Sequence, residues 1–158
     1  MEGVFKELFT IAYFRRNTLI LIVCWSSVSF NYYLVNFLLQ FIEGSIYNNS
    51  IASSMSDVIS ILFSGMLLSK LGLKLSFVIY FLLATAGGVL YLIFGADHPE
   101  DVAIIILIAK FGVSAAFNLV YIANAVLYPP SLAATAMGIC NIFARIATVL
   151  APEIAEIP

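Results

Sequence analysis

The chain has 158 residues, of which 63% are apolar and only 10% are charged. Soluble domains are ~45–50% apolar and ~25% charged, and a soluble domain of this size has too little interior to bury such an excess of apolar side chains. The solvent around most of the chain is therefore a lipid bilayer, which excludes a disordered chain and an ordinary soluble enzyme. The net charge of −2 indicates no polyanionic partner, so we expect no nucleic acid partner.

Five apolar stretches each match the ~20 residues that a helix needs to cross a ~30 Å hydrocarbon core. A helix is required because backbone amides without partners are too costly in lipid, and a transmembrane barrel would show ~10-residue alternating segments instead. We therefore predict an all-α polytopic transmembrane helix bundle. Its predicted spans are 17–41, 51–69, 75–94, 102–127 and 135–155. The half-bundle covers 17–155, after a cytoplasmic N-terminal segment at 1–16 and before a tail at 156–158.

Charge placement predicts the orientation of the bundle. Basic residues precede the first span and separate the second from the third: Lys6, Arg15, Arg16, Lys70 and Lys74. The connectors 43–50 and 95–101 carry acidic residues and no Lys or Arg. The positive-inside rule then places the N-terminus in the cytoplasm, and we expect the membrane to be the plasma membrane. Asn48 begins a glycosylation sequon on the expected outer side.

Three charged residues lie well inside the predicted spans, away from their ends, where charges are expensive and are functional candidates: Asp57, Lys110 and Arg145. Each shares a helical face with polar residues at spacings of three and four, and the first span carries a polar stripe of its own. The stripes favour a water-accessible cavity that contacts a polar solute. The alternative is that they bond across helices and only hold the bundle together. The candidate substrate-binding residues are Asn31, Tyr32, Asp57, Lys110, Asn118, Tyr121 and Arg145.

The depths of the three charges can be read from the helical rise. Asp57 lies about 9 Å and Lys110 about 12 Å below the outer boundary, so we expect them to pair, and such a pair could be purely structural. Arg145 lies about 15 Å inside, near the midplane. The arginine would then be left to meet the solute, where its fork favours a carboxylate.

Catalytic and metal-binding patterns are absent from the sequence. No nucleophile–base pair and no glycine-rich phosphate loop occurs. Cys24 and Cys140 lie in apolar stretches, and His98 is the only histidine, so no metal-ligand cluster is formed. We therefore expect neither enzymatic activity nor a cofactor or metal.

Two runs of residues resemble motifs of the major facilitator superfamily. The run LLSKLGLK at 67–74 resembles the cytoplasmic loop motif L-L-D-R-x-G-R-[RK] of that superfamily. The run KFGVSAAFN at 110–118, followed by Tyr121 and by LYP at 127–129, is similar to the superfamily's organic ion transporters, with [GA]-[KR]-F-G-[IV]-[ST]-x-x-F-N and then E-L-Y-P. The resemblance covers nearly the whole chain as the seventh to eleventh helices of a twelve-helix transporter. It assigns to the cytoplasmic loop motif Lys70, Gly72, Lys74, Tyr128 and Pro129.

The resemblance implies a partial major facilitator fold and part of a secondary active transporter that moves a small organic ion by alternating access. Its implied partners are the lipid bilayer, a small organic solute, and a missing N-terminal half and twelfth helix or another transporter chain. In the family, the position of Arg145 is acidic in many cation transporters and arginine in anion and carnitine-type members. The resemblance therefore favours an anion or a zwitterion.

Four residues depart from the family pattern. The family has charged residues at the positions of Ser69, Leu73, Val126 and Ala133, and by resemblance those residues form a cytoplasmic network that locks the outward-facing state. Only Lys70 and Lys74 remain here. The alternative function is therefore a non-transporting truncated membrane protein, or a helper subunit that only packs against other helices.

The orientation generates a labelling prediction. A cysteine introduced by Ala96→Cys should react with an impermeant thiol reagent added from outside, because the acidic connector is expected on that side. A cysteine introduced by Ser69→Cys should be protected from the same reagent. Protection at position 96 together with labelling at position 69 would reverse the orientation.

Overall fold

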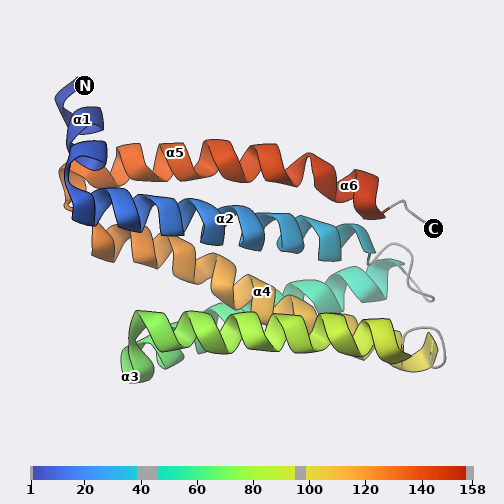
Figure 1. Ribbon diagram of the computed structural model, residues 1–158. Helices are drawn as coiled ribbons and strands as arrows, with labels where there is room; N and C mark the ends of the chain where they lie inside the picture. The colour runs from blue at the N-terminus through green and yellow to red at the C-terminus, as the bar shows by residue number, and fades with distance from the viewer. Residues whose placement is uncertain (1, 39–45, 95–98, 156–158) are drawn as a thin grey trace.

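The computed structural model describes residues 2–38, 46–94 and 99–155, and this part of the chain is almost entirely helical, with no strand (Figure 1). The helices are α1 (Glu2–Thr10), α2 (Ala12–Leu38), α3 (Ile46–Phe94), α4 (Pro99–Leu127), α5 (Pro130–Thr148) and α6 (Leu150–Ala155). Four helical segments are long and apolar enough to cross a membrane: Ala12–Leu38, Asn49–Phe94, Ile104–Leu127 and Pro130–Ile154. The prediction of an all-α membrane bundle is confirmed.

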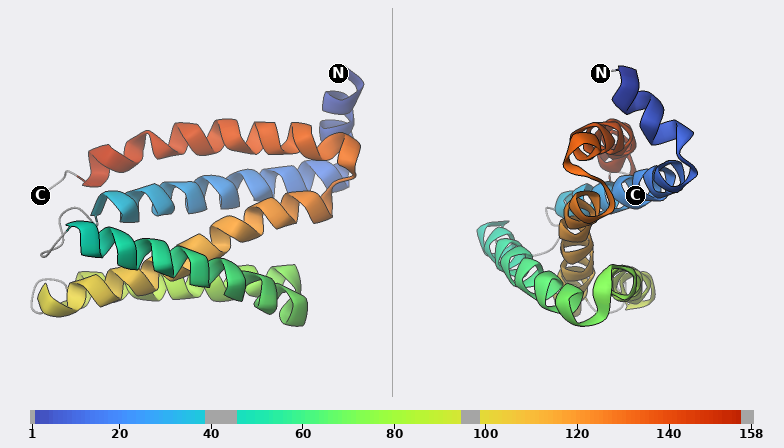
Figure 2. Two further views of the ribbon diagram at one scale, coloured as in Figure 1. Left: turned by 180° about the vertical axis from the view of Figure 1, so that it is seen from behind. Right: turned by 90° about the vertical axis from the view of Figure 1, so that its left-hand side faces the viewer.

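The helix α3 is a hairpin rather than one straight rod. Gly72 has φ 76° and ψ 173°, a conformation that residues with a side chain rarely adopt, and the helix reverses there. The two arms, 46–71 and 73–94, meet at this turn, and α3 packs extensively on α4 (Figures 1 and 2). The predicted connector 70–74 is therefore wrong as a loop, because a single glycine makes the turn. Counting both arms, five segments cross the bundle, which is the predicted number.

Other helix boundaries also differ from the prediction. The helix α2 begins at Ala12 rather than at residue 17, and most of the remaining N-terminal segment forms α1. The helix α5 begins at Pro130 rather than at residue 135, because proline fits the first turn of a helix, where its missing amide is not needed. The helix α3 begins inside the predicted connector 43–50. Residues 39–45 and 95–98, including Ala96, and the tail 156–158 lie outside the described residues.

The helices arrange the basic segments at one end of the bundle. The start of α2, the bend of α3 and the connection between α4 and α5 lie together at that end, and α1 crosses it against α2 and α5 (Figures 1 and 2). The starts of α3 and α4 lie at the opposite end (Figure 1). This arrangement agrees with the charge pattern, while the assignment of the basic end to the cytoplasm stays a prediction.

The core of the bundle is centred on α4, which packs against α2, α3 and α5. Ala115, Leu119 and Val120 of α4 are fully buried, as is Trp25 of α2. Large apolar side chains such as Leu92, which is 82% exposed, cover the outside. An apolar exterior of this extent fits a lipid solvent.

Two glycines set the distance between α3 and α4. A Cβ atom on Gly112 would lie 2.6 Å from the backbone nitrogen of Ala84, and one on Gly87 would lie 2.6 Å from the Cβ atom of Ala109. The two backbones therefore touch where both residues are small, as expected for helix packing in a membrane.

This contact predicts opposite effects for two Gly→Ala variants. Gly112→Ala should lower the free energy of unfolding by about 1–3 kcal/mol, because the new methyl group overpacks the interface. Gly138→Ala on α5 is the matched control: no atom lies within 4 Å of its Cβ position. Alanine's helix propensity should there raise stability by up to about 1 kcal/mol. Unfolding in detergent, followed by Trp25 fluorescence, measures both, and equal effects would contradict the packing argument.

Candidate functional site

An ion pair joins the first arm of α3 to α4. The Nζ atom of Lys110 lies 3.3 Å from Oδ2 of Asp57. The side chain of Lys110 is only 3% exposed and that of Asp57 is 24% exposed. The pairing expected from their similar depths is therefore present. Its consequence is that these two charges neutralise each other inside the bundle.

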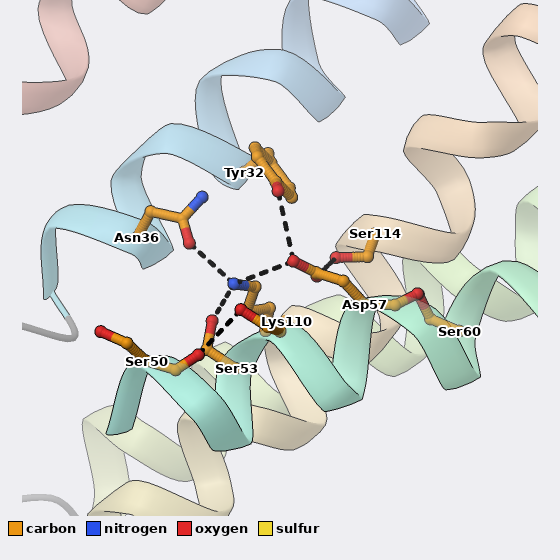
Figure 3. Close-up of polar contacts among 9 residues, drawn as sticks. Tyr32, Asn36, Ser50, Ser53, Asp57, Ser60, Lys110 and Ser114 are labelled. Atoms are coloured by element: carbon orange, nitrogen blue, oxygen red, sulfur yellow. Dashed lines mark hydrogen bonds and ion pairs between the residues drawn. The ribbon is translucent and has the colours of Figure 1, made fainter. Parts of the chain in front are cut away.

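The ammonium group of Lys110 has two further oxygen partners. It donates a hydrogen bond to Oδ1 of Asn36 on α2, over 2.7 Å, and another to the hydroxyl of Ser53 on α3. It also lies 5.5 Å from the centre of the Tyr32 ring, within reach of a cation–π interaction. Figure 3 shows the ammonium nitrogen between these groups. Burial of this cation is thus compensated by side chains from two neighbouring helices.

The carboxylate of Asp57 is held by two hydroxyl groups as well as by Lys110. Tyr32 on α2 donates to Oδ2 over 3.3 Å, and Ser114 on α4 donates to Oδ1 over 2.5 Å (Figure 3). The cluster of Tyr32, Asn36, Ser53, Asp57, Lys110 and Ser114, here called the ion-pair cluster, joins α2, α3 and α4. Because every member has a polar partner, the cluster can fix the relative positions of three helices.

Arg145 lies apart from the ion-pair cluster, on α5. Its side chain is exposed, and Nη1 donates a hydrogen bond to the hydroxyl of Tyr33 over 3.0 Å. The guanidinium carbon lies 6.0 Å from the centre of the Tyr33 ring. Among the residues that the structure describes, no carboxylate lies within ion-pairing distance of Arg145. The guanidinium group of Arg145 therefore has N–H donors available to an anion.

A row of aromatic rings lies between α2 and α4. Successive ring centres are 5.8, 5.2, 5.6 and 4.7 Å apart along Tyr33, Tyr32, Phe117, Tyr121 and Trp25. At one end of the row, the ring of Tyr33 contacts Arg145, and the next ring, that of Tyr32, faces the ammonium group of Lys110. Sequence reasoning placed Tyr33 on the polar stripe of the first span without making it a site candidate. It missed Phe117, although Phe117 shares a helical face with the candidate Tyr121 at a spacing of four.

Two other candidates make contacts of a structural kind. The amide of Asn118 donates to the hydroxyl of Ser64 over 2.6 Å, which links α4 to α3. Asn31 donates to the backbone oxygen of Ser27 in its own helix. Asn31 lines a separate cavity of about 470 Å³ between α2, α3 and α4 instead of joining the ion-pair cluster. A substrate role for either residue stays a prediction.

The loop-motif residues gather at the basic end. Lys70 and Lys74 are exposed on either side of Gly72. The hydroxyl of buried Tyr128 lies 2.8 Å from that of Thr18, which ties the end of α4 to α2, and Pro129 precedes α5. Burial raises the pKa of the Tyr128 phenol, so the hydroxyl stays protonated at neutral pH. The side chain of Asn48 lies outside the described residues, and no group of three metal ligands occurs among those described.

Comparison with known proteins finds membrane transporters of organic ions among the relatives of this chain. No protein-family model matches the chain. The chain is 28% identical to Solute carrier family 22 member 4 of Mus musculus, 29% to Organic cation/carnitine transporter 2 of Homo sapiens and 31% to Organic anion transporter 3 of Rattus norvegicus. These alignments cover 85%, 87% and 93% of this chain but only 24%, 25% and 27% of the relatives. The chain thus spans about a quarter of their length.

The ion pair predicts a strong coupling between two substitutions. Asp57→Asn alone should lower the free energy of unfolding by about 3–5 kcal/mol, because it leaves the buried charge of Lys110 uncompensated. Lys110→Met alone should cost less, because the carboxylate that it leaves unpaired is 24% exposed. The double variant should lose less than the sum, since neither charge remains. Denaturant unfolding in detergent measures all four proteins. Additive losses would mean that the two charges are not coupled in the folded chain.

Proposed function

Because the chain is a homologue of the solute carrier family 22 organic cation and anion transporters, of the major facilitator superfamily, we propose that it is part of a secondary active transporter. Its solute is a small organic ion, an anion or zwitterion in preference to a cation. The chain lies in the plasma membrane with its N-terminus in the cytoplasm. It works with a second half-bundle, supplied by further transporter sequence or by another chain.

The exposed guanidinium group of Arg145 carries the proposal. Of the three charged residues expected inside the membrane, Lys110 and Asp57 neutralise each other, and Arg145 is left. The remaining charge is therefore positive. A guanidinium group binds a carboxylate through two parallel hydrogen bonds, which gives both charge and orientation selectivity. The relatives include an organic anion transporter and an organic cation/carnitine transporter, so the preference for an anion rests on Arg145.

The aromatic row supports an organic rather than an inorganic solute. Tyr33 contacts Arg145, and Tyr32 and Phe117 continue the row toward the ion-pair cluster. A solute whose carboxylate meets Arg145 would find ring faces next to it for its apolar body. Convergence of a few polar groups on an apolar, aromatic surface is typical of small-molecule sites.

The ion-pair cluster supports alternating access by a rigid half-bundle. In this mechanism one bundle rocks against another around a site near the bilayer midplane. The cluster joins α2, α3 and α4 through side chains, so these helices would move as one body. Arg145 on α5 would face the second half-bundle across the solute.

One observation favours the alternative of a non-transporting helper. At the basic end, Val126 is 69% exposed where the family resemblance expects a glutamate, and Ser69 replaces an acidic residue. Without those charges the cytoplasmic lock of the family is absent or built from other residues. A chain that only packs against other helices would not need it.

A graft tests the two functions. In the graft, this chain replaces the segment of rat Organic anion transporter 3 with which it aligns. Uptake of radiolabelled benzoate is then measured in cells that make the graft. We expect saturable uptake, which Arg145→Ala lowers by about 10- to 100-fold, since a hydrogen bond to a charged group contributes about 1.5–3 kcal/mol. Arg15→Ala removes the same charge from the exposed start of α2 and is the matched control.

Three outcomes separate the possibilities. Unchanged uptake in the Arg145→Ala graft would remove the anion assignment. A graft that reaches the cell surface but moves neither benzoate nor an organic cation would favour the helper function. The isolated chain in liposomes should give no saturable uptake, because one half-bundle has nothing to rock against, and uptake there would indicate that a second copy completes the transporter.

A further inference from the structure

The Nζ atom of Lys110 occupies a position surrounded by three oxygen atoms from three different side chains. They are an amide oxygen of Asn36, a hydroxyl oxygen of Ser53 and a carboxylate oxygen of Asp57. An ammonium group has three N–H donors and no acceptor, so the number of donors equals the number of acceptors around it. The three oxygens come from α2 and α3, whereas the cation comes from α4 (Figure 3).

The same three oxygens form a poor site for anything but a cation. Lys110 is 2% exposed, so little water reaches the centre of the group. A half-buried carboxylate beside two further acceptor oxygens is costly unless a positive charge compensates it. Tyr32 and Ser114 donate to the carboxylate from other directions and hold it in place, and the face of the Tyr32 ring adds negative potential toward the same centre.

We propose that Asn36, Ser53 and Asp57 form a binding site for one small monovalent cation, and that the ammonium group of Lys110 fills it as a tethered ion. Oxygen ligands of this kind suit hard cations such as sodium and hydrogen-bond donors such as a primary ammonium ion. The native chain therefore binds no free cation here. One consequence rests on the proposed function: during transport, Lys110 supplies the positive charge at this position, and no co-transported cation binds there.

Emptying the site by substitution tests the proposal. Lys110→Met keeps the apolar stem of the side chain and removes the nitrogen. The 158-residue chain carries a single tryptophan, the buried Trp25, so thermal unfolding in detergent can be followed by its fluorescence. Native and variant chains are compared in sodium chloride, methylammonium chloride and choline chloride at equal concentration. Choline provides the same charge but is larger and has no N–H group to donate a hydrogen bond.

The expected result is a gain of cation response in the variant alone. Lys110→Met should melt about 2–4 °C higher in methylammonium or sodium than in choline, at a concentration a few times the dissociation constant. The native chain should melt at the same temperature in all three salts, because its site is already filled. Asp57→Asn with Lys110→Met is the control that should fold without responding, since its site has lost the carboxylate.

Several results would overturn the proposal. Equal melting of Lys110→Met in the three salts is one, and an equal response of the double variant is another, because it would be a general salt effect. Failure of Lys110→Met to fold in any of the salts, while the double variant folds, is a third, because a bound cation should restore the fold. These experiments measure melting temperatures and not uptake, so none of these results would contradict the proposed transport function.

Discussion

A positive charge buried away from water is the constraint on which the arrangement of three helices depends. Lys110 lies in the middle of α4, among fully buried small residues, and lipid offers its ammonium group no partner. Compensation must therefore come from neighbouring helices. Asp57 and Ser53 reach it from α3 and Asn36 reaches it from α2, which fixes both the spacing and the rotation of these helices relative to α4.

Close backbone packing makes that compensation geometrically possible. Gly112 lies two residues after Lys110, and there the backbone of α4 touches that of the second arm of α3. The turn at Gly72 brings the first arm back alongside, so that Asp57 meets the lysine. Small residues and the ion pair thus act together: the small residues let the helices approach, and the ion pair favours the register in which Asp57 meets Lys110.

The Lys110–Asp57 pair and the exposed Arg145 have different surroundings. Lys110 is committed to Asp57 and to two neutral oxygens, so it has little left for a solute. Arg145 projects from α5, which packs mainly on α2, and its described polar contact is with Tyr33. In the proposed transporter, the compensated cation would hold the helices together and the uncompensated one would be left to recognise the solute.

The sequence by itself determined that the chain is an all-α membrane bundle with five crossing segments, because lipid forces every backbone amide into a helix and the length of each apolar stretch is set by the bilayer. It also predicted that Asp57 and Lys110 pair, since their similar depths follow from counting residues along each helix, and the structure confirms the pair. Only the tertiary structure decided which way each helix is rotated. Tyr32 and Asn31 are neighbours in sequence, yet Tyr32 reaches Asp57 while Asn31 lines a separate cavity, because adjacent residues on a helix point about 100° apart. The aromatic row could not be predicted from the sequence for the same reason. Its members come from α2 and α4, and only packing decides which sides of these two helices face each other.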